Sequence, residues 1–391
     1  MPEAYIVSAR RTAGGRRNGR LAGWHPVDLG AAVLDALVAE TGIDPAAIDD
    51  VIIGCVSQVG EQGFAFGRNI VLASSLPDSV PAVTIDRQCG SSQQALHFAA
   101  QAVMSGTQDL VIAGGAESMS RVWMGSPLTL AAQAGMGEGP VSKSIQQRYG
   151  VTEFNQFVGA QAVADKHGID RAMMDRFALG SHQKAAAAIA AGAFAKEMVP
   201  LTVTTATGEQ IIHDRDEGVR PDSTLESIGS VKLLAEGGSL TAATASQICD
   251  GASGVLVASA AAVKTHGLTP LARIVNLTVT AGDPVIMLEE PIPATRRALA
   301  RAGMTIDDID LFEVNEAFAS IPLAWLKTLG ADPDRLNVHG GAIALGHPLG
   351  ASGTKLMATL IHALHKKGKR YGLQTMCEGG GISNVTIIER L

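Results

Sequence analysis

Short apolar runs that end at glycine alternate with longer amphipathic stretches in the first third of the chain. Residues 5–7, 50–54 and 109–114 are typical of buried strands, because strands covered on both faces read as nearly continuous apolar runs. Residues 29–37 instead have the periodicity of a helix. We therefore expect an α/β fold in which helices and strands alternate around a mostly parallel sheet.

The carboxyl-terminal third repeats this order, with a strand at 309–313, a helix at 355–364 and a strand at 371–376. Two turns extend the likeness. Residues 89–92 open a helix that leads to a strand ending in glycine, and residues 350–353 open a helix that leads to the strand ending at Cys377. The sequence therefore predicts a duplication that brings the active ends of two similar halves together.

The middle of the chain has a different character. Residues 120–245 carry scattered Met, Gln, Lys and Arg in what read as short helices, with little sign of a continuous buried sheet. We expect an inserted loop or lid domain there. The core halves are then residues 1–119, completed by about 246–270, and residues 271–391.

Composition and charge limit the classes of ligand. With 391 residues the chain is long enough for two core domains, and it is too polar on average for a membrane bundle. Its 44 glycines and 4% aromatic residues favour tight turns and an aliphatic core over aromatic stacking platforms. A net charge of -7 opposes general nucleic-acid binding, so an anionic ligand requires a local basic patch.

The cysteines are spaced neither as a redox pair nor as a structural zinc site, so we expect no metal. Reduced thiols indicate a cytoplasmic protein. The amino terminus reads as the start of a strand and lacks the features of a signal peptide, so secretion is not expected. The four cysteines are Cys55, Cys89, Cys249 and Cys377.

Cys89 stands where an irregular segment turns into a helix. Free backbone N–H groups and the positive helix end are expected to stabilise its thiolate, which favours a nucleophile. An isolated cysteine is more often a small buried apolar residue. The glycine and serines that follow Cys89, and the residues at the other end of the chain, favour the nucleophile.

His347 lies between Gly346 and Pro348, where a helix cannot continue and glycine permits close approach of a substrate. With a pKa near neutrality it would deprotonate Cys89 and then donate to a carbonyl oxygen. Cys377, at a strand end and followed by glycines, is interpreted as a thiol for acid–base work. The N–H of a following glycine would bind an oxyanion.

Taken together, these residues make the chain resemble the thiolase family, the acetyl-CoA acetyltransferases and 3-ketoacyl-CoA thiolases, over essentially its whole length. The resemblance implies a thiolase fold, with two mixed-sheet halves in a layered αβαβα arrangement and an inserted loop domain. It also implies a homodimer or homotetramer. The matching motifs are residues 7–12, 114–120, 315–318, 340–353 and 377–381.

The resemblance implies a role for each reactive residue. Cys89 would carry the acyl group, His347 would activate it, and Cys377 would move protons on the acetyl-CoA methyl or the CoA thiol. One oxyanion hole would combine His347 with a water held by Asn315, and the other would use the N–H groups of Cys89 and Gly379. Coenzyme A would be a co-substrate, with no prosthetic group.

For CoA, the resemblance points to Ser246 near the pantetheine, Arg220 toward the nucleotide, and Ala317 and Phe318 along the tunnel. Many relatives have Asn, Gly and Asn where this chain has Thr244, Gln247 and Cys249. These departures leave the reactive residues unchanged but alter the pantetheine surroundings, and Cys249 is interpreted as a packing residue.

Residues 155–162 depart from the His-Met-Gly signature of short-chain biosynthetic thiolases. The acyl pocket is therefore predicted to differ from the acetoacetyl one, and some relatives without the signature act on bulkier chains, including steroid side chains. The sequence leaves chain length open.

The predicted reaction is the reversible CoA-dependent thiolysis of a 3-ketoacyl-CoA to acetyl-CoA and a shortened acyl-CoA. A non-catalytic acyl-CoA-binding member of the fold is the alternative, although it would be expected to lack a reactive group. A decarboxylating synthase would pair its cysteine with two histidines, whereas the late position here is Cys377. A serine hydrolase is disfavoured because the chain has no GxSxG motif.

Overall fold

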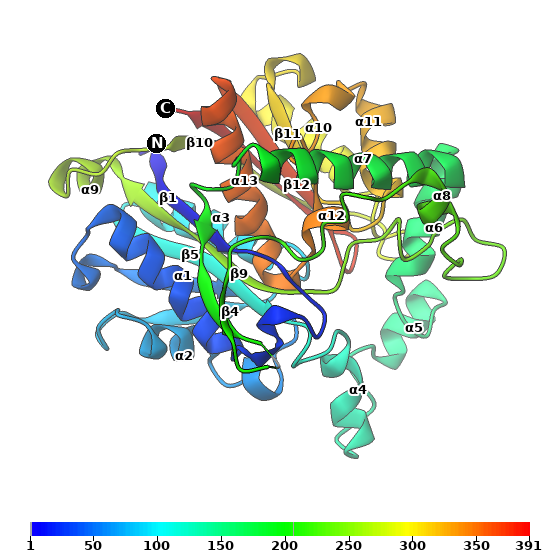
Figure 1. Ribbon diagram of the computed structural model, residues 1–391, viewed down its shortest axis with the longest axis horizontal. Helices are drawn as coiled ribbons and strands as arrows, with labels where there is room; N and C mark the ends of the chain where they lie inside the picture. Colours follow the sequence, from blue (N-terminus) through cyan, green and yellow to red (C-terminus); the bar gives the residue numbers. More distant parts are fainter. Residues whose placement is uncertain (1, 206) are drawn as a thin grey trace.

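A large mixed β-sheet forms the centre of the protein, whose structure is a computed structural model that describes residues 2–205 and 207–391 (Figure 1). The strands of the sheet are β1 (Ala4–Thr12), β2 (Gly15–Arg16), β3 (Asp50–Gly54), β4 (Ala82–Ile85), β5 (Leu110–Ser118), β6 (Met198–Val199), β9 (Cys249–Ser259), β10 (Ala272–Ala281), β11 (Leu311–Val314), β12 (Tyr371–Glu378) and β13 (Ile382–Arg390). The main strands lie in the order β11-β12-β13-β10-β1-β9-β5-β3-β4.

The sheet consists of two halves with the same strand order, joined edge to edge. In the amino-terminal half, β3 is parallel to β4 and β5, while β9 runs antiparallel between β5 and β1. In the carboxyl-terminal half, β11 and β12 are parallel and β13 runs antiparallel between β12 and β10. The expectation of a mostly parallel sheet is thus wrong, because the last strand of each half inserts beside the first one.

The two halves meet where β1 pairs with β10, through Tyr5 opposite Arg273 and Ile6 opposite Ala272. The sheet is therefore continuous by hydrogen bonding, although each half has its own helices. A parallel bridge from Phe312 to Leu336 lies beside β11, as β4 lies beside β3. This repeat agrees with the predicted duplication.

Helices cover both outer faces and fill the space between the halves. α1 (Pro26–Thr41) and α2 (Phe66–Ala73) pack on the amino-terminal half, and α10 (Pro291–Ala302) and α11 (Ser320–Leu329) pack on the other. α3 (Ser91–Ser105) and α13 (Ser352–Lys367) lie between the halves and share one apolar cluster with β1, β9 and β11 (Figure 1). The layers are therefore those of an αβαβα fold.

The crossing of α3 and α13 is close because glycine stands at the contact. A Cβ on Gly353 would lie 2.1 Å from the backbone nitrogen of Gln93. The first turns of the two helices thus touch through backbone atoms, and the residues just before each helix are brought near one another. These are the loops that hold Cys89 and His347.

Most predicted elements of the halves are present. The strand at 50–54 has the predicted bounds. α1 extends the predicted 29–37 helix to Pro26, where proline suits the first turn, and to Thr41, after which Gly42 ends it with φ of 64°. α13 likewise contains the predicted 355–364 helix. Periodicity located the centres of these helices, and the glycine and proline signals lie at their ends.

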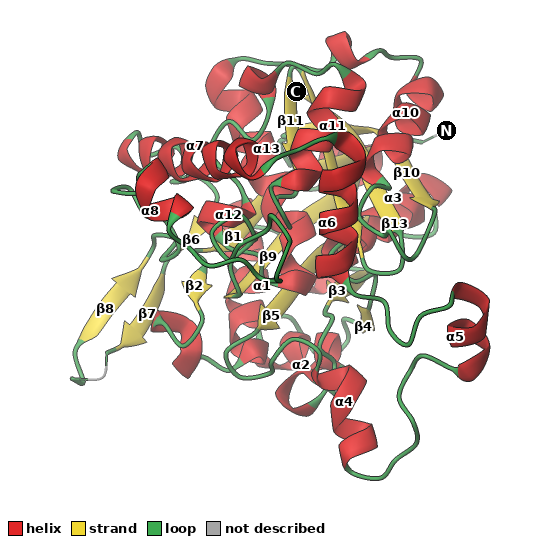
Figure 2. Ribbon diagram, turned by 90° about the vertical axis from the view of Figure 1, so that its right-hand side faces the viewer, coloured by secondary structure: helices red, strands yellow, loops and turns green. Residues whose placement is uncertain are grey.

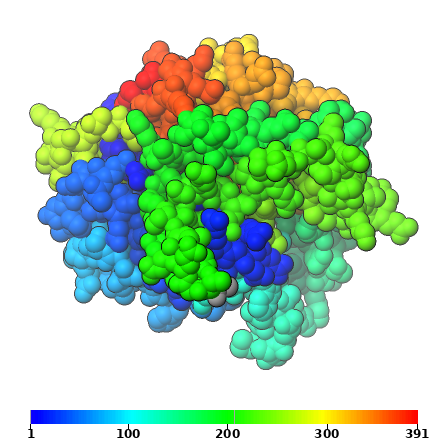
Figure 3. Space-filling view, viewed as in Figure 1, coloured from blue at the N-terminus to red at the C-terminus, as the bar shows by residue number. Residues whose placement is uncertain are grey.

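Residues 120–245 carry the additional elements α4 (Ser126–Gln133), α5 (Lys143–Tyr149), α6 (Gln156–His167), α7 (Arg171–Ala190), α8 (Leu225–Gly229), β7 (Leu201–Thr204) and β8 (Gln210–His213). The expectation of only short helices is wrong for α7, which has 20 residues and buries Met174 and Ala178 against the carboxyl-terminal half. α4 and α5 stand away from the sheet (Figure 2). The green part of the segment lies across the molecule between the two halves (Figure 3).

The remaining helical segments of the described residues are α9 (Ala260–Thr265), α12 (Ala342–Leu345) and the short 3-10 turns η1 (Arg20–Gly23), η2 (Pro45–Ala47), η3 (Gly60–Gln62), η4 (Ile306–Asp308), η5 (Pro333–Arg335) and η6 (Leu349–Ala351). No helix within the described residues is both long and apolar enough to span a bilayer.

Candidate active site

Cys89 lies in a tight turn directly before α3. Gln88 adopts φ of 50°, a conformation that side chains other than glycine seldom take, and its N–H donates to Asp86 Oδ1 over 2.6 Å. The N–H of Arg87 donates to Ser91 Oγ over 3.0 Å. The turn is thus fixed on both sides, and it projects the Cys89 thiol at the start of the helix.

The thiol of Cys89 is neutral in this environment. Burial, and then the nearby Glu378 side chain in its carboxylate form, raise its pKa to about 12. The expectation of a resting thiolate is therefore wrong, because burial and the Glu378 carboxylate raise the pKa of the thiol more than the backbone N–H of Cys89 lowers it. Cys89 needs a base that removes its proton.

His347 lies in the loop between α12 and α13. The Ser352 hydroxyl donates to the carbonyl oxygen of Pro348 over 2.9 Å and is therefore free to accept from His347 Nδ1–H. Nε2 then has its lone pair available, and it lies 3.5 Å from Asn315 Nδ2. The ring is oriented as a base through Nε2.

Burial, and then Lys355, lower the pKa of His347 to about 3. The expectation of a pKa near neutrality is therefore wrong for the free protein. The imidazole is uncharged throughout the physiological range, so it is able to accept a proton at any such pH.

The backbone of His347 is held by a residue whose role the sequence did not reveal. His347 N–H donates to the carbonyl oxygen of Gln247 over 3.0 Å. Gln247 Nε2 in turn donates to the carbonyl oxygens of Ile343, at 2.6 Å, and Gly218, at 2.9 Å. Gln247 therefore links the histidine loop to the inserted segment, whereas the sequence identified it only as a departure from glycine.

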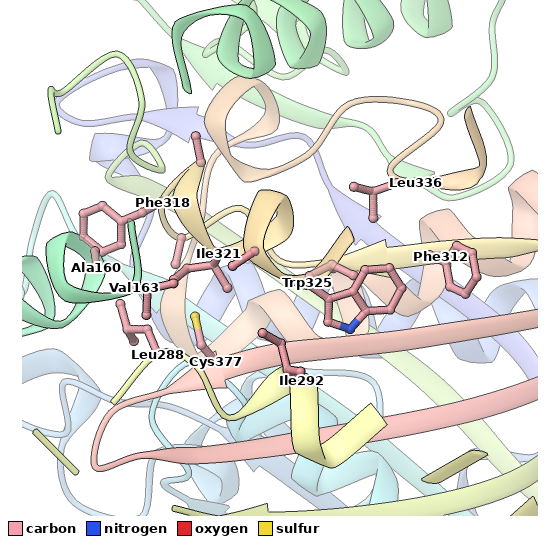
Figure 4. Packing of buried hydrophobic residues seen from close by; sticks show 14 of the residues in the cluster. Ala160, Val163, Leu288, Ile292, Phe312, Phe318, Ile321, Trp325, Leu336 and Cys377 are labelled. Atoms are coloured by element: carbon pink, nitrogen blue, oxygen red, sulfur yellow. The ribbon is translucent and has the colours of Figure 1, made fainter. Parts of the chain in front are cut away.

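Cys377 lies at the end of β12, fully buried. Its side chain points among Leu288, Ile292 and Ile321 (Figure 4). Burial, and next the proximity of Cys89, raise the pKa of its thiol. The structure thus brings together two neutral thiols from opposite ends of the chain.

Gly379 approaches the turn that carries Cys89. A Cβ on Gly379 would lie 2.8 Å from Gln88 Oε1, so a side chain there would require the Gln88 amide to shift. The backbone of Gly379 therefore lies beside the Cys89 turn, as the predicted oxyanion site requires.

Asn315 follows β11 and is buried. Its N–H donates to the carbonyl oxygen of Thr375 over 3.1 Å, which ties it to β12 beside Cys377. The next residue, Glu316, accepts hydrogen bonds from Ser181 Oγ and from the N–H of Ile343. Glu316 thus connects the Asn315 turn to α7 and α12, a role that the sequence did not predict.

Glu117 makes a second connection that the sequence missed. This fully buried carboxyl accepts from the N–H groups of Val56 and Gly350, both at 2.9 Å, and from Gln62 Nε2 at 2.8 Å. It therefore attaches the loop after His347 to the amino-terminal half. A lone glutamate within an apolar strand was the available signal.

Three of the residues predicted to contact CoA lie side by side. Ser246 N–H donates to the carbonyl oxygen of Ala317 over 2.9 Å, and Phe318 forms a β-bridge with Ala245. The Phe318 ring meets Phe157 edge to face, with centroids 5.5 Å apart. Ser246 is half-buried, so this wall borders accessible space.

Arg220 lies apart from that group. Its side chain is exposed, and its N–H donates to His182 Nδ1 over 3.3 Å on α7. The contacts of the described residues do not join the Arg220 guanidinium to Ser246. Its placement at the surface suits the charged end of a long ligand.

The other departures from relatives are accommodated by packing. Cys249 is buried, and a Cβ on Gly346 would lie 2.6 Å from its sulfur. The carbonyl oxygen of Thr244 accepts from the N–H of Ala319 over 2.8 Å. Over the part of the chain that the structure describes, no group of three or more His, Cys, Asp or Glu is arranged to hold a metal ion.

Comparison with known proteins places this site in a family. The model of the thiolase N-terminal domain matches residues 4–261, and that of the thiolase C-terminal domain matches residues 268–390. The chain belongs to the thiolase family. Thiolases use CoA substrates.

Similar thiolases extend over the whole chain. A steroid 3-ketoacyl-CoA thiolase of Mycobacterium tuberculosis is 54% identical over 100% of this chain and 95% of its own length. A beta-ketoadipyl-CoA thiolase of Acinetobacter baylyi is 42% identical, with both chains fully covered. The crystal structure of human mitochondrial 3-ketoacyl-CoA thiolase superposes with a TM-score of 0.89 at 36% identity, covering 100% of this chain and 99% of the other. The fold of this protein is therefore the thiolase fold.

Proposed function

We propose that the protein catalyses the reversible CoA-dependent thiolysis of a 3-ketoacyl-CoA through an acyl-enzyme on Cys89. The observation that carries the proposal is the meeting of two neutral thiols, Cys89 and Cys377, at a site where His347 presents an unprotonated Nε2 beside Asn315. Full-length similarity to 3-ketoacyl-CoA thiolases supports it.

In the first half of the reaction, the Cys89 proton passes to His347 Nε2 and the sulfur attacks the 3-keto carbon. The bond between C2 and C3 then breaks, and its electron pair forms the enolate of acetyl-CoA. Cys377 gives its proton to this carbanion, so acetyl-CoA leaves and the shortened acyl group stays on Cys89.

In the second half, the CoA thiol gives its proton to the Cys377 thiolate, and the CoA sulfur attacks the Cys89 thioester. Cys89 leaves as a thiolate and recovers the proton held by His347. All three groups return to their neutral state, which is the state that burial favours in the free protein.

Two negative oxygens form during this cycle, and each needs its own donors. We assign the N–H groups of Cys89 and Gly379 to the tetrahedral oxygen, and His347 with Asn315 to the enolate oxygen. The closeness of Gly379 to the Cys89 turn and the pairing of Asn315 with His347 support this assignment.

The test is an assay of acetyl-CoA release from a 3-ketoacyl-CoA and CoA, together with mass spectrometry of the acylated protein. We expect one acyl group on Cys89, and no turnover by Cys89→Ser, because a hydroxyl is hardly ionised in such a site. An acyl group on Cys55, Cys249 or Cys377 would contradict the assignment. A protein that binds acyl-CoA without turnover would instead be the non-catalytic alternative.

We further propose a bulky acyl group as substrate. Phe157 and Val158 lie at the start of α6 and are 41% and 60% exposed, and the Phe157 ring contacts Phe318 of the proposed CoA wall edge to face. Exposed Trp123 and Met124 lie close, since Gln156 Nε2 reaches Met124 Sδ at 3.7 Å. An apolar surface of this extent suits a medium, long or cyclic chain, and a steroid 3-ketoacyl-CoA thiolase is among the relatives.

In a series of 3-ketoacyl-CoA substrates, kcat/KM for thiolysis is expected to be higher for these chains than for acetoacetyl-CoA. Phe157→Ala is expected to narrow the difference, because it removes apolar contact from the long chain only. A clear preference for acetoacetyl-CoA would contradict the proposed substrate class.

Three further proposals concern the residues that contact CoA, the cellular location of the protein and the limits of its domains. Ser246, Ala317 and Phe318 would line the pantetheine channel, and Arg220 would meet the nucleotide. Four free cysteines support a cytoplasmic location. The division into halves 1–119 with 246–270 and 271–391, with 120–245 inserted, follows the repeat of strand order.

A homodimer or homotetramer is supported by the edge of the sheet. β4 pairs with β3 on one side, is the last strand in the described sheet order, and exposes Val83. An unprotected edge with an apolar side chain favours pairing with another copy. Light scattering after size-exclusion chromatography is expected to give a dimer or tetramer mass, and a monomer mass would contradict it.

A further inference from the structure

We propose that Glu378 is a positioning residue for the nucleophile: it lies against the Cys89 turn as a neutral carboxylic acid, and its ionisation at alkaline pH makes the Cys89 thiolate harder to form. The inference rests on the proposed role of Cys89 and adds to it a control on when this thiol reacts.

Glu378 is placed against the nucleophile by its position at the end of β12 and by the turn at Gly90. It is the last residue of β12, directly after Cys377, and it is fully buried. Its carboxyl lies so close to Gly90 that a Cβ there would be 2.1 Å from Glu378 Oε1. A side chain at position 90 would require the Glu378 carboxyl to shift, so the glycine next to Cys89 allows the carboxyl to lie against the turn.

The hydrogen bonds of Glu378 leave one oxygen unmatched. Oε1 accepts from the N–H of Asn384 on β13 over 2.9 Å. Oε2 is buried, and no donor within the described residues lies at hydrogen-bonding distance. A carboxylate in such a position is costly, whereas a carboxylic acid has a proton of its own to donate.

The neighbourhood is short of donors. Three other buried side-chain oxygens in the layer between α3 and the sheet are also without a donor among the described residues: Gln93 Oε1, Gln374 Oε1 and Asn384 Oδ1. An additional anion would increase this surplus of acceptors, and a protonated Glu378 would reduce it.

The charges around Glu378 agree with a neutral acid. The titratable or charged groups around the pair Cys89 and Glu378 are Asp86, Arg87, His97, Glu117 and Cys377. Arg87 acts on Glu378 through its charge, without a direct ion pair, and burial lowers the pKa of His97 to about 3, so that ring is uncharged. Burial prevails and raises the pKa of Glu378 to about 8.

The consequence for Cys89 follows from the sign of the charge. After burial, the Glu378 carboxylate is the largest cause that raises the Cys89 pKa. Below about pH 8 the carboxyl is neutral and exerts no such effect, so transfer of the Cys89 proton to His347 is easier. Above about pH 8, the Glu378 carboxylate repels the Cys89 thiolate that the reaction needs.

The decisive variant is Glu378→Gln, which keeps the shape and removes the ionisation. Alkylation of Cys89 by iodoacetamide, followed peptide by peptide with mass spectrometry across pH 6 to 10, reports thiolate formation without any turnover. At pH 9.5 the variant is expected to react about tenfold faster than the wild type, since one unit of pKa changes the thiolate fraction about tenfold. Equal rates at every pH would overturn the proposal.

Thiolysis gives a second readout. The wild type is expected to lose kcat/KM with an apparent pKa of about 8, and Glu378→Gln to lack that decline. Glu209→Gln, on an exposed turn, is the matched control and is expected to keep the wild-type profile. If Glu378→Gln still lost kcat/KM at alkaline pH, the proposed effect of Glu378 on Cys89 would be wrong, but the proposed thiolase reaction would be unaffected.

Infrared titration of the wild type covers the case in which the variant does not fold. Glu313 is also buried with a raised pKa, so the band of Glu378 is identified as a carboxylic-acid C=O band that disappears near pH 8 together with the change in the alkylation rate of wild-type Cys89. The absence of such a band would overturn the proposal, and neither this measurement nor alkylation depends on the thiolase assay.

Discussion

Burial, rather than pairing of charges, sets the state of the reactive residues. Cys89 has its pKa raised to about 12 and His347 has its pKa lowered to about 3, so neither is charged in the free protein. An ion pair of thiolate and imidazolium is therefore absent at rest. Proton transfer becomes favourable when the substrate oxygen takes up the negative charge, which ties activation of Cys89 to a bound substrate.

Replacement of Cys377 is expected to block a different step of the reaction from replacement of Cys89. Cys377→Ala is expected to become acylated on Cys89 by a simple acyl-CoA, because acylation needs only Cys89, His347 and an oxyanion site. Carbon–carbon cleavage is expected to fall by on the order of a hundredfold or more, because the group that moves the proton at the acetyl carbon is lost.

Mass spectrometry of the acylated variant and an assay of acetyl-CoA release measure these two steps separately. Cys55→Ala, at a buried thiol outside the proposed chemistry, is the control for loss of a cysteine. Near-native thiolysis by Cys377→Ala would show that this cysteine has another role.

At the scale of elements, the loops before α3 and α13 are positioned by backbone contacts. Gly353→Ala would place a Cβ 2.1 Å from the backbone nitrogen of Gln93, which has little freedom to move. We expect a loss of about 1–3 kcal/mol in the free energy of unfolding, as for other overpacked core sites.

Gly180→Ala is the matched control, because Gly180 lies within α7 and a Cβ there meets no atom within 4 Å. It is expected to leave stability unchanged or raise it by up to about 1 kcal/mol. Denaturant unfolding measures both variants, and equal stabilities would show that the crossing of α3 and α13 adapts to the added methyl group.

The same contacts explain how far the sequence predicted the structure. Apolar runs and glycines located β3 and α13, and the motifs around Cys89, His347 and Cys377 indicated the reactive residues. The antiparallel insertion of β9 and β13 was not predicted, because strand direction depends on partners far away in the chain. The pKa values were wrong for the same reason, since burial is a property of the assembled layers.

Supporting residues were also missed where their partners are distant. Gln247 contacts the backbone of Ile343 and His347. Glu117 contacts Gly350, which lies 233 residues later in the chain. A single polar residue in an apolar stretch signals a buried contact, but it does not identify the partner.

At the scale of the whole molecule, one buried ionic cluster connects all three parts of the chain. Arg11 of the amino-terminal half donates to Asp216 of the inserted segment, at 2.8 and 3.1 Å, and also bonds Glu197. Lys355 of α13 lies 3.7 Å from Asp216 and donates to the carbonyl oxygen of Gly346 over 3.2 Å. The cluster therefore links the inserted segment to the loop that carries His347.

Arg11→Met is expected to destabilise the fold by about 3–5 kcal/mol, because the buried carboxylates of Glu197 and Asp216 each lose Arg11 as a partner.

The effect of Arg11→Met depends on pH. The charges of Arg11 and Lys355 lower the pKa of Asp216 despite its burial, so its stabilising contribution is present above the unfolded pKa of about 3.8 and is lost as pH falls through the lower folded value. In Arg11→Met the folded pKa of Asp216 rises, so acid unfolding is expected at higher pH.

Arg16→Met, at a side chain 69% exposed, is the control and is expected to change the free energy of unfolding by less than about 1 kcal/mol. Unfolding curves from pH 3 to 8 measure both variants, and the same acid midpoint for Arg11→Met and the wild type would contradict a stabilising role for the cluster.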